Sequence, residues 1–224
     1  MTSFKYIDRK ADNVTVLLPG WATDCRIFAS LNFKSDLIVP LEMSPYDFEK
    51  SLFNVLQKND KPVSIFGFSM GGFMAARFAS ENPGLIDRLT LVGIRARYNH
   101  EEIEKIKRYL IKNKKAYLYS FFSSAFSGKK EMRRFKSELL KSYCDKFDLD
   151  YLLKTLDYLG RCAINPCMLA RVKNVKIIHG ERDSIAPIDE ARAIKEGSPR
   201  AEFVEIKGAG HIPFFSEEKS KVLW

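Results

Sequence analysis

A short glycine-rich segment contains the residue with the clearest chemical potential, Ser69. Residues 67–72 read Gly-Phe-Ser-Met-Gly-Gly and stand between an apolar run that ends at residue 66 and a helical pattern over 71–80. A serine at the apex of a sharp strand-to-helix turn takes a strained backbone conformation, and glycines two residues before and after it leave room for the crossing. The N-terminal amides of the helix then point at a developing oxyanion. We therefore predict that Ser69 is a nucleophile.

A serine nucleophile requires a base, and the sequence has three histidines. His100 stands among polar residues, which indicates a solvated helix start. His179 ends an apolar run and precedes a glycine, which indicates packing or capping at a strand end. His211 lies in an irregular loop over 208–213, directly after an apolar run, where a mobile catalytic base would be placed. We therefore expect His211 to take the proton of Ser69.

The base in turn requires a carboxylate that orients it, and Asp183 follows the apolar run 175–178. Asp189 lies near a predicted helix start, where capping is the simpler role. The chain order Ser69, Asp183, His211 is the order of α/β-hydrolases and differs from that of the two well-known serine-protease folds. Asp183 is therefore predicted to hold the imidazole, and a plain turn or cap role is its alternative.

The elements that must position these residues can be read from the hydrophobic pattern. Six short runs rich in β-branched and aliphatic residues predict strands over 14–18, 37–39, 63–66, 89–92, 175–178 and 203–206. Helical patterns lie between several of them, over 45–58, 71–80 and 189–196. Nearly continuous apolar strands that alternate with helices indicate an α/β fold with a mainly parallel sheet covered on both faces.

Residues 95–165 break this alternation, because only helical patterns appear there, notably over 101–111 and 149–159. We predict a core made of residues 1–94 and 166–224, interrupted by a helical cap over 95–165. Residues 95–146 contain fifteen Lys and Arg against six Asp and Glu, which equals the net charge of +9 for the whole chain. The rest of the chain is therefore electrically balanced, and the excess charge attracts an acidic partner or is simply a solvated helical face.

The overall composition excludes several classes of protein. With 46% hydrophobic and 29% charged residues the chain is too apolar to be disordered, and it has no apolar run of 18 residues. The first residues lack the apolar block of a signal peptide, and the four cysteines have no regular spacing. We therefore expect a cytoplasmic protein with reduced thiols that acts as a monomer and not at a membrane.

Residues 17–22, Leu-Leu-Pro-Gly-Trp-Ala, resemble the H-G-x-x oxyanion loop of α/β-hydrolases. Together with the motifs above, this resemblance spans nearly the whole chain and implies the α/β-hydrolase fold with an inserted cap. It also implies that the backbone N–H groups of Trp21 and Met70 form the oxyanion hole, without a metal or organic cofactor. Pro19 stands where the family usually has histidine, which alters the usual support of the loop but removes no expected donor.

A finer resemblance concerns the methyl ester esterases that act on pimeloyl-[acyl-carrier-protein] in biotin synthesis. The Pro-Gly-Trp segment over 19–21, the Ser69 segment and the Gly-His-Ile-Pro-Phe segment over 210–214 are similar to theirs, and so is the stretch 153–159. This resemblance implies a serine carboxylesterase that hydrolyses an acyl methyl ester presented by an acidic acyl carrier protein.

Two groups of residues would serve such a substrate. Aromatic side chains predicted to line an acyl pocket, with core packing as the alternative, are Phe68, Tyr117, Phe121, Phe122 and Phe126. Basic side chains predicted to dock the carrier protein are Lys129, Lys130, Arg133, Arg134 and Lys136. Nucleic acid is a poorer partner for this charge, because no base-reading module is present.

Three other functions fit the same sequence. The first is a carboxylesterase or thioesterase that acts on free small acyl compounds, with lysines that only aid solubility. The second is an enzyme that breaks a different bond with the same residues, since this fold supports many reactions. The third is a non-catalytic ligand-binding protein built on a hydrolase scaffold, and failure to react with a fluorophosphonate probe would favour it.

Overall fold

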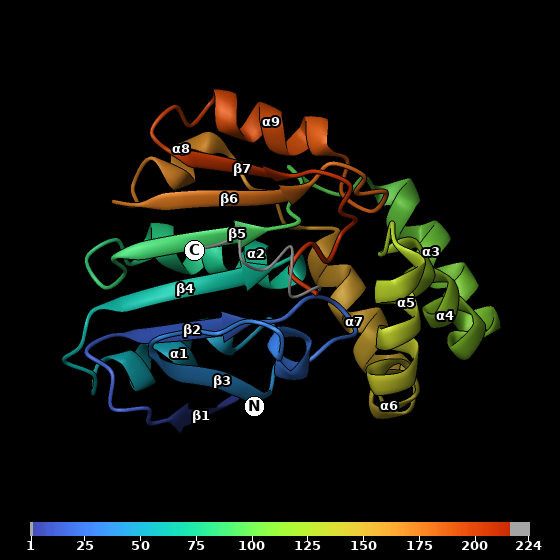
Figure 1. Cartoon of the computed structure of the whole chain (residues 1–224), viewed down its shortest axis with the longest axis horizontal. Coiled ribbons are helices and arrows are strands. Elements are labelled where there is room, and N and C mark those ends of the chain that lie inside the picture. Colours follow the sequence, from blue (N-terminus) through green and yellow to red (C-terminus); the bar gives the residue numbers. More distant parts are fainter. Residues whose placement is uncertain (1, 216–224) are drawn as a thin grey trace.

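The computed structural model describes residues 2–215, which form a seven-stranded sheet with helices on its faces and a cluster of helices at one end (Figure 1). The strands follow the order β1-β3-β2-β4-β5-β6-β7. Their bounds are β1 Ser3–Ile7, β2 Val14–Leu18, β3 Asp36–Glu42, β4 Val63–Phe68, β5 Arg88–Val92, β6 Val175–Gly180 and β7 Glu202–Ile206. All neighbouring pairs are parallel except β1 and β3. The predicted α/β architecture is confirmed.

The six predicted strands correspond to β2 through β7, whereas β1 is an addition that the sequence pattern did not predict. Strand β1 pairs antiparallel with β3 at the edge of the sheet and has no fully buried side chain. An edge strand of this kind needs no continuous apolar run, since one side of it faces solvent. The sequence of β1 therefore contains too few apolar residues in a row to be recognised as a strand.

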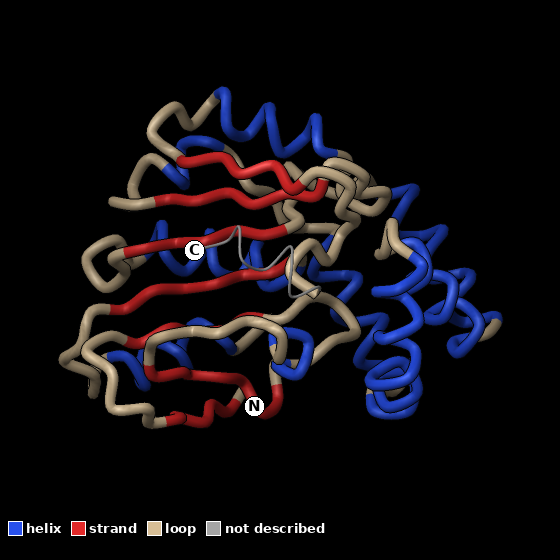
Figure 2. Tube along the Cα trace, in the orientation of Figure 1, coloured by secondary structure: helices blue, strands red, loops and turns tan. Residues whose placement is uncertain are grey.

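Some helices pack on the faces of the sheet, and others lie beyond the ends of the parallel strands. Their bounds are α1 Phe48–Leu56, α2 Met70–Glu81, α3 His100–Lys112, α4 Lys114–Ser124, α5 Lys129–Phe135, α6 Lys141–Lys146, α7 Leu149–Leu159, α8 Pro166–Leu169 and α9 Ile188–Glu196, with a 3₁₀ turn η1 Cys25–Phe28 and a π-helical turn η2 Lys136–Leu140. Figure 2 shows that helix dominates the side of the molecule toward which the strands run. None of the helices within residues 2–215 is both long and apolar enough to cross a bilayer.

Residues 95–165, between β5 and β6, contain α3 through α7 and no strand, as the sequence pattern predicts, although one isolated bridge joins Arg97 to Ala163. In Figure 1 these helices gather at the arrowhead end of the sheet. The division into a core, residues 1–94 and 166–224, and a cap, residues 95–165, remains a prediction. All four cysteines, each within the described residues, are free thiols.

Candidate active site

The turn that carries Ser69 joins β4 to α2. Ser69 has φ +50° and ψ −116°, a conformation that non-glycine residues rarely adopt, and its backbone N–H donates to Val92 O at 2.9 Å. A Cβ placed on Gly67 would lie 2.6 Å from Gly71 O, so the two glycines of the motif approach each other as the sequence predicts. Any larger residue would push the backbone apart. The turn therefore holds Ser69 in a strained position at the carboxyl end of the sheet.

The loop after β2 packs directly against this turn. A Cβ placed on Gly71 would lie 2.1 Å from Leu18 O, and one on Gly20 would lie 3.2 Å from Ser69 Cβ. The backbone of this loop therefore runs beside the serine, with Trp21 following Gly20. Met70 is the first residue of α2, where N–H groups have no intrahelical acceptor. Both proposed oxyanion donors thus come from backbone adjacent to Ser69.

The three residues predicted to act together are brought into one hydrogen-bonded chain. His211 Nε2 lies 2.9 Å from Ser69 Oγ, and His211 Nδ1 lies 2.7 Å from Asp183 Oδ2. The exposed fractions of Ser69, His211 and Asp183 are 7%, 2% and 7%, so little water competes for these contacts. They come from the ends of β4, β6 and β7, which neighbour one another through β5. A Cβ on Gly93, at the end of β5, would lie 3.2 Å from the His211 ring, so glycine there makes room for the imidazole.

The Asp183 carboxylate is held by donors on both oxygens. Its Oδ1 accepts the backbone N–H groups of Ile185 and Ala186, each at 2.9 Å. Burial raises the pKa of Asp183, but the charge of His211 and the hydrogen bonds from His179 and His211 lower it by more, so its pKa lies well below the ordinary value. An ionised Asp183 accepts the Nδ1–H of His211, which leaves His211 Nε2 free to accept the Ser69 proton.

The other histidines occupy different environments. His100 is the exposed first residue of α3, a helix that begins with a capping box between Asn99 and Glu102, in agreement with its predicted place at a helix start. His179 is fully buried at the end of β6, also as predicted, but its Nε2 lies 3.3 Å from Asp183 Oδ2. Sequence reasoning missed this contact. Its signal is the spacing of four residues across a tight turn, which brings a strand-end side chain back onto the carboxylate.

The Trp21 side chain ties the oxyanion loop to the helical segment. It is 4% exposed, and its Nε1–H donates to Leu152 O of α7 at 3.2 Å. Its ring meets Phe121 edge to face with centroids 5.1 Å apart and approaches Tyr117 at 6.4 Å. These are favourable aromatic geometries. The loop beside Ser69 is therefore positioned partly by α4 and α7.

A cavity of about 320 Å³ lies beside Ser69, between the sheet and the helices α3, α4 and α7. Most of its lining is apolar or aromatic, which suits an acyl chain. Of the predicted pocket residues, Tyr117 and Phe121 line this cavity. Phe68 and Phe122 line a smaller hollow that contains both Ser69 and His211. The prediction that Phe126 lines the acyl pocket is wrong. Its side chain lines neither space and packs instead on Phe135 and Phe215.

The charged residues on the cavity are not those that the sequence singled out. Arg95 and Lys105 line it, and Arg95 forms ion pairs with Glu102 at 3.3 Å and Glu190 at 2.8 Å. The residues predicted to dock a carrier protein lie on α5 and at the start of η2 and do not line this cavity: Lys129, Lys130, Arg133, Arg134 and Lys136. The turn before α5 contacts the His211 loop, since Ser127 Oγ donates to Gly208 O at 2.6 Å. The five predicted docking residues therefore lie on the side of the site that carries the His211 loop.

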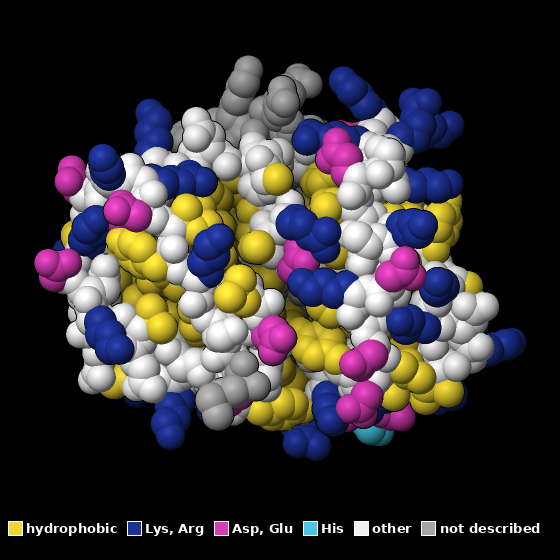
Figure 3. Space-filling model, turned by 90° about the horizontal axis from the view of Figure 1, so that it is seen from below, with side chains coloured by type: hydrophobic (Ala, Val, Ile, Leu, Met, Phe, Trp, Pro, Cys, Tyr) yellow, Lys and Arg dark blue, Asp and Glu magenta, His cyan; other side chains and the backbone are white. Residues whose placement is uncertain are grey.

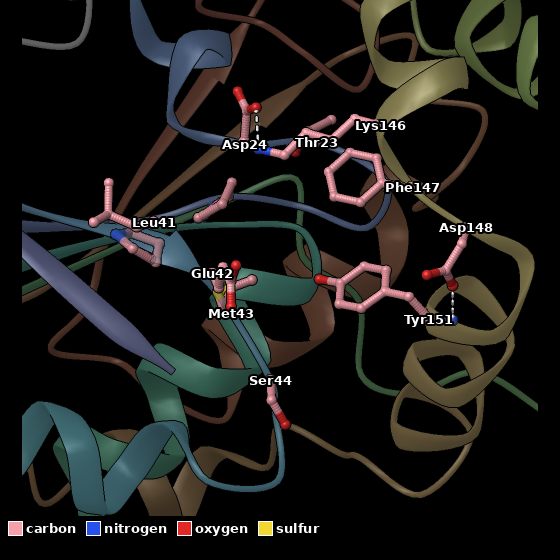
Figure 4. A pocket seen from close by; sticks show the side chains of 12 residues that line it. Thr23, Asp24, Leu41, Glu42, Met43, Ser44, Lys146, Phe147, Asp148 and Tyr151 are labelled. Carbon is pink, nitrogen blue, oxygen red and sulfur yellow. Dashed lines mark hydrogen bonds and ion pairs between the residues drawn. The ribbon is translucent and has the colours of Figure 1, made fainter. Parts of the chain in front are cut away.

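A second hollow, of about 400 Å³, opens where the end of β3 faces the α6–α7 connection (Figure 4). Leu41 and Met43 line one side, and Phe147 and Tyr151 line the other with stacked rings 5.4 Å apart. Figure 3, seen from the β1 edge, shows apolar side chains exposed between the two halves of the molecule and more Lys and Arg over the helical half. Ser69 does not line this hollow, which therefore stands apart from the candidate active site.

Within residues 2–215, no group of three or more His, Cys, Asp and Glu side chains is arranged to hold a metal ion. Around Ser69 a hydroxyl, an imidazole bonded to it, a carboxylate bonded to the imidazole and adjacent backbone N–H groups lie together, and these are the groups that nucleophilic acyl transfer requires.

Comparison with known proteins shows which sequences and folds this chain resembles. Residues 44–133 match the family model for the alpha/beta hydrolase fold. An esterase from Exiguobacterium antarcticum superimposes with a TM-score of 0.82 at 16% identity, over 99% of this chain and 92% of that one. A bromoperoxidase from Bacillus anthracis superimposes with a TM-score of 0.81 at 17% identity, over the same shares. The structure therefore has the α/β-hydrolase fold.

The sequence also has a curated relative with a defined activity. The chain is 26% identical over 176 residues to the pimeloyl-[acyl-carrier protein] methyl ester esterase of Chromobacterium violaceum, a match that covers 72% of this chain and 67% of the relative. The resemblance to this group of esterases is therefore found by direct comparison as well as by motif.

Proposed function

We propose that this protein is a serine hydrolase of carboxylic esters in which Ser69 is the nucleophile, His211 the general base and Asp183 the orienting carboxylate. The observation that carries this proposal is the continuous path from Ser69 Oγ through His211 to Asp183, with contacts of 2.9 Å and 2.7 Å, beside an apolar cavity. The match of residues 44–133 to the family model for the alpha/beta hydrolase fold supports the same reaction class.

The reaction follows from this geometry. Ser69 Oγ attacks the ester carbonyl while His211 Nε2 takes its proton, and Asp183 stabilises the imidazolium that forms. The N–H groups of Trp21 and Met70 bind the oxyanion, and each such donor accounts for roughly 10² to 10³ in rate. His211 then protonates the leaving alkoxide and activates water, which releases the acid and restores Ser69.

For the substrate, we propose the methyl ester of an acyl chain carried by an acyl carrier protein, as in the pimeloyl ester of biotin synthesis. The curated relative is named for this activity, and the cavity beside Ser69 offers an apolar lining for such a chain. An acyl carrier protein is acidic, and residues 95–146 contain the whole excess of positive charge. In this proposal residues 95–165 act as a cap that lines the cavity and receives the carrier.

The test compares one acyl methyl ester in two forms, linked to acyl carrier protein and free. We expect turnover of the carrier-linked ester to fall as salt rises, because screening weakens the attraction between the partners, whereas turnover of the free ester changes little. A Lys129→Glu, Lys130→Glu, Arg133→Glu variant should lower kcat/KM for the carrier-linked form about tenfold at low salt. The matched control is Lys34→Glu, Lys50→Glu, Lys58→Glu, which reverses the same number of exposed charges outside the helical segment.

A second candidate, a carboxylesterase or thioesterase on free small acyl compounds, is favoured by one observation. The five predicted docking residues lie outside the cavity lining, so a small substrate can enter without meeting them. Equal turnover of the free and carrier-linked esters at every salt concentration would favour this candidate over the carrier protein. If neither ester is turned over and Ser69 does not react with a fluorophosphonate, the ligand-binding alternative is correct instead.

A further inference from the structure

His179 has contacts that a residue serving only to fill space does not require. It is fully buried at the end of β6, and its Nε2 lies 2.7 Å from Ala186 O and 3.3 Å from Asp183 Oδ2. Among the described residues its Nδ1 has no hydrogen-bond partner. One ring nitrogen therefore has two acceptors before it, and the other has none.

This arrangement selects one tautomer. A carbonyl and an ionised carboxylate can only accept hydrogen bonds, so Nε2 must carry the hydrogen. A proton on Nδ1 as well would leave a buried, charged N–H without an acceptor, which is costly. The neutral ring with hydrogen on Nε2 is thus the favoured form. The ionisable groups that face it are Asp183 on its own loop and, through Asp183, His211; Glu205, its register partner on β7, forms an ion pair with Arg192.

The same ring also stabilises the turn that presents the carboxylate. Ala186 accepts the His179 hydrogen bond through its oxygen and donates its own N–H to Asp183 Oδ1 at 2.9 Å. His179, Ala186 and Asp183 therefore form a closed set of contacts, and all three are at least nine-tenths buried. Without the donor on His179, Ala186 O loses its partner and Asp183 Oδ2 keeps only His211.

We propose that His179 is a positioning residue, which fixes the Asp183 loop and shares Asp183 Oδ2 with His211, so that it determines how strongly the carboxylate attracts the imidazolium. This inference rests on the proposed function, because the effect is exerted through Asp183 and His211. His179 itself does not touch the reacting atoms.

Two nearly isosteric variants separate the hydrogen bond from the volume. In His179→Gln the amide nitrogen can occupy the position of Nε2 and donate to the same acceptors, whereas His179→Met fills similar space without a donor. We expect kcat/KM for a p-nitrophenyl ester to fall about ten- to a hundredfold in the methionine variant and only a few-fold in the glutamine variant. Equal losses in both variants would overturn the proposal.

The pH dependence of kcat/KM gives a readout that a purely structural role would not move. In the methionine variant Asp183 Oδ2 has lost a donor, so its negative charge attracts the imidazolium of His211 more strongly. The acidic limb of the profile should then move to higher pH by about 0.5 unit, with no shift in the glutamine variant. A methionine variant that loses activity with an unmoved acidic limb would show that His179 acts only through stability.

A measurement that does not depend on turnover keeps this inference distinct from the proposed function. In ¹⁵N NMR spectra of the wild-type protein at neutral pH, the His179 ring should carry its hydrogen on Nε2, which faces two acceptors, and none on Nδ1, which faces no acceptor among the described residues. Hydrogen on Nδ1 in these spectra would overturn the inference even if ester hydrolysis is normal. Loss of ester hydrolysis in the wild type with this NMR signature intact would instead count against the proposed function.

Discussion

The turn around Ser69 and the helical segment beside it are held by different kinds of contact. In the turn, backbone packs on backbone: added Cβ atoms on Gly67 and Gly71 would lie 2.6 Å and 2.1 Å from carbonyl oxygens. In the helical segment, side chains pack on side chains, as in the aromatic group of Phe122, Phe135 and Tyr143. Backbone has little freedom to move, whereas side chains repack.

This difference suggests separate roles: the turn positions the reacting groups, and the helical segment selects the substrate. The backbone-packed turn leaves the nucleophile and the proposed oxyanion donors little room to move. The helical segment supplies most of the cavity lining and all of the excess charge, and neither belongs to the turn itself. Substitutions in the turn should therefore affect every substrate alike, and substitutions in the helices should change the choice among substrates.

The largest effect is expected from Ser69→Ala. If Ser69 is the nucleophile, ester hydrolysis should fall by about 10⁴-fold or more, because the covalent step is lost. The melting temperature should remain within a few degrees, because only one oxygen atom is removed. Stopped assays with a p-nitrophenyl ester and a thermal melt test both expectations, and retained turnover would contradict the mechanism.

Gly71→Ala tests the backbone packing itself. Its added Cβ would lie 2.1 Å from Leu18 O, so the β2 loop or the turn must move, and activity should fall at least about 10²-fold toward every ester, with a lower melting temperature. Gly84→Ala is the control, because no heavy atom lies within 4 Å of its added Cβ. Similar activities for the two variants would show that the turn is more pliable than its geometry indicates.

Phe121→Ala should change the preference of the enzyme for acyl chain length. Removal of the ring that lines the cavity and contacts Trp21 should raise KM for a long acyl ester about tenfold and leave an acetyl ester nearly unchanged. Phe126→Ala is the matched control, since Phe126 lies in the same segment but outside the cavity. It should lower stability without changing the preference for chain length. A length preference altered equally by both variants would contradict this assignment of roles.

The smallest effect concerns stability far from Ser69. Asp36 is fully buried; a hydrogen bond from Lys61, and then one from Tyr6, lower its pKa well below the ordinary value. Stabilisation from such a group is complete above its unfolded pKa, near 3.9, and is lost as pH falls toward the folded pKa. Asp36→Asn should therefore lower the melting temperature most above pH 5, and the gap to the wild type should narrow below pH 4. A constant gap would indicate that the carboxylate charge contributes nothing.

The sequence pattern was informative where a residue's role depends on its immediate neighbours. Strands β2, β4 and β6 appear as apolar runs, because nearly all of their residues are buried. Strand β7, at the edge of the sheet, keeps an apolar run although most of its residues are only half-buried. The turn at Ser69 appears as a pattern of glycines, because the crowding arises within five residues. Strand β1 and the exclusion of Phe126 from the cavity were not accessible in this way, since each depends on which distant element lies alongside.

The sequence by itself determined the order of elements, the strained serine turn and the location of the excess charge. These follow from local sterics, hydrophobic periodicity and simple counting, which need no knowledge of the rest of the molecule. Only the tertiary structure decided that Ser69, His211 and Asp183 meet, that Trp21 donates to Leu152 O, and that a second histidine contacts the carboxylate. Such contacts join residues from separate strand ends and helices, and their distances depend on how the sheet and the helices pack together.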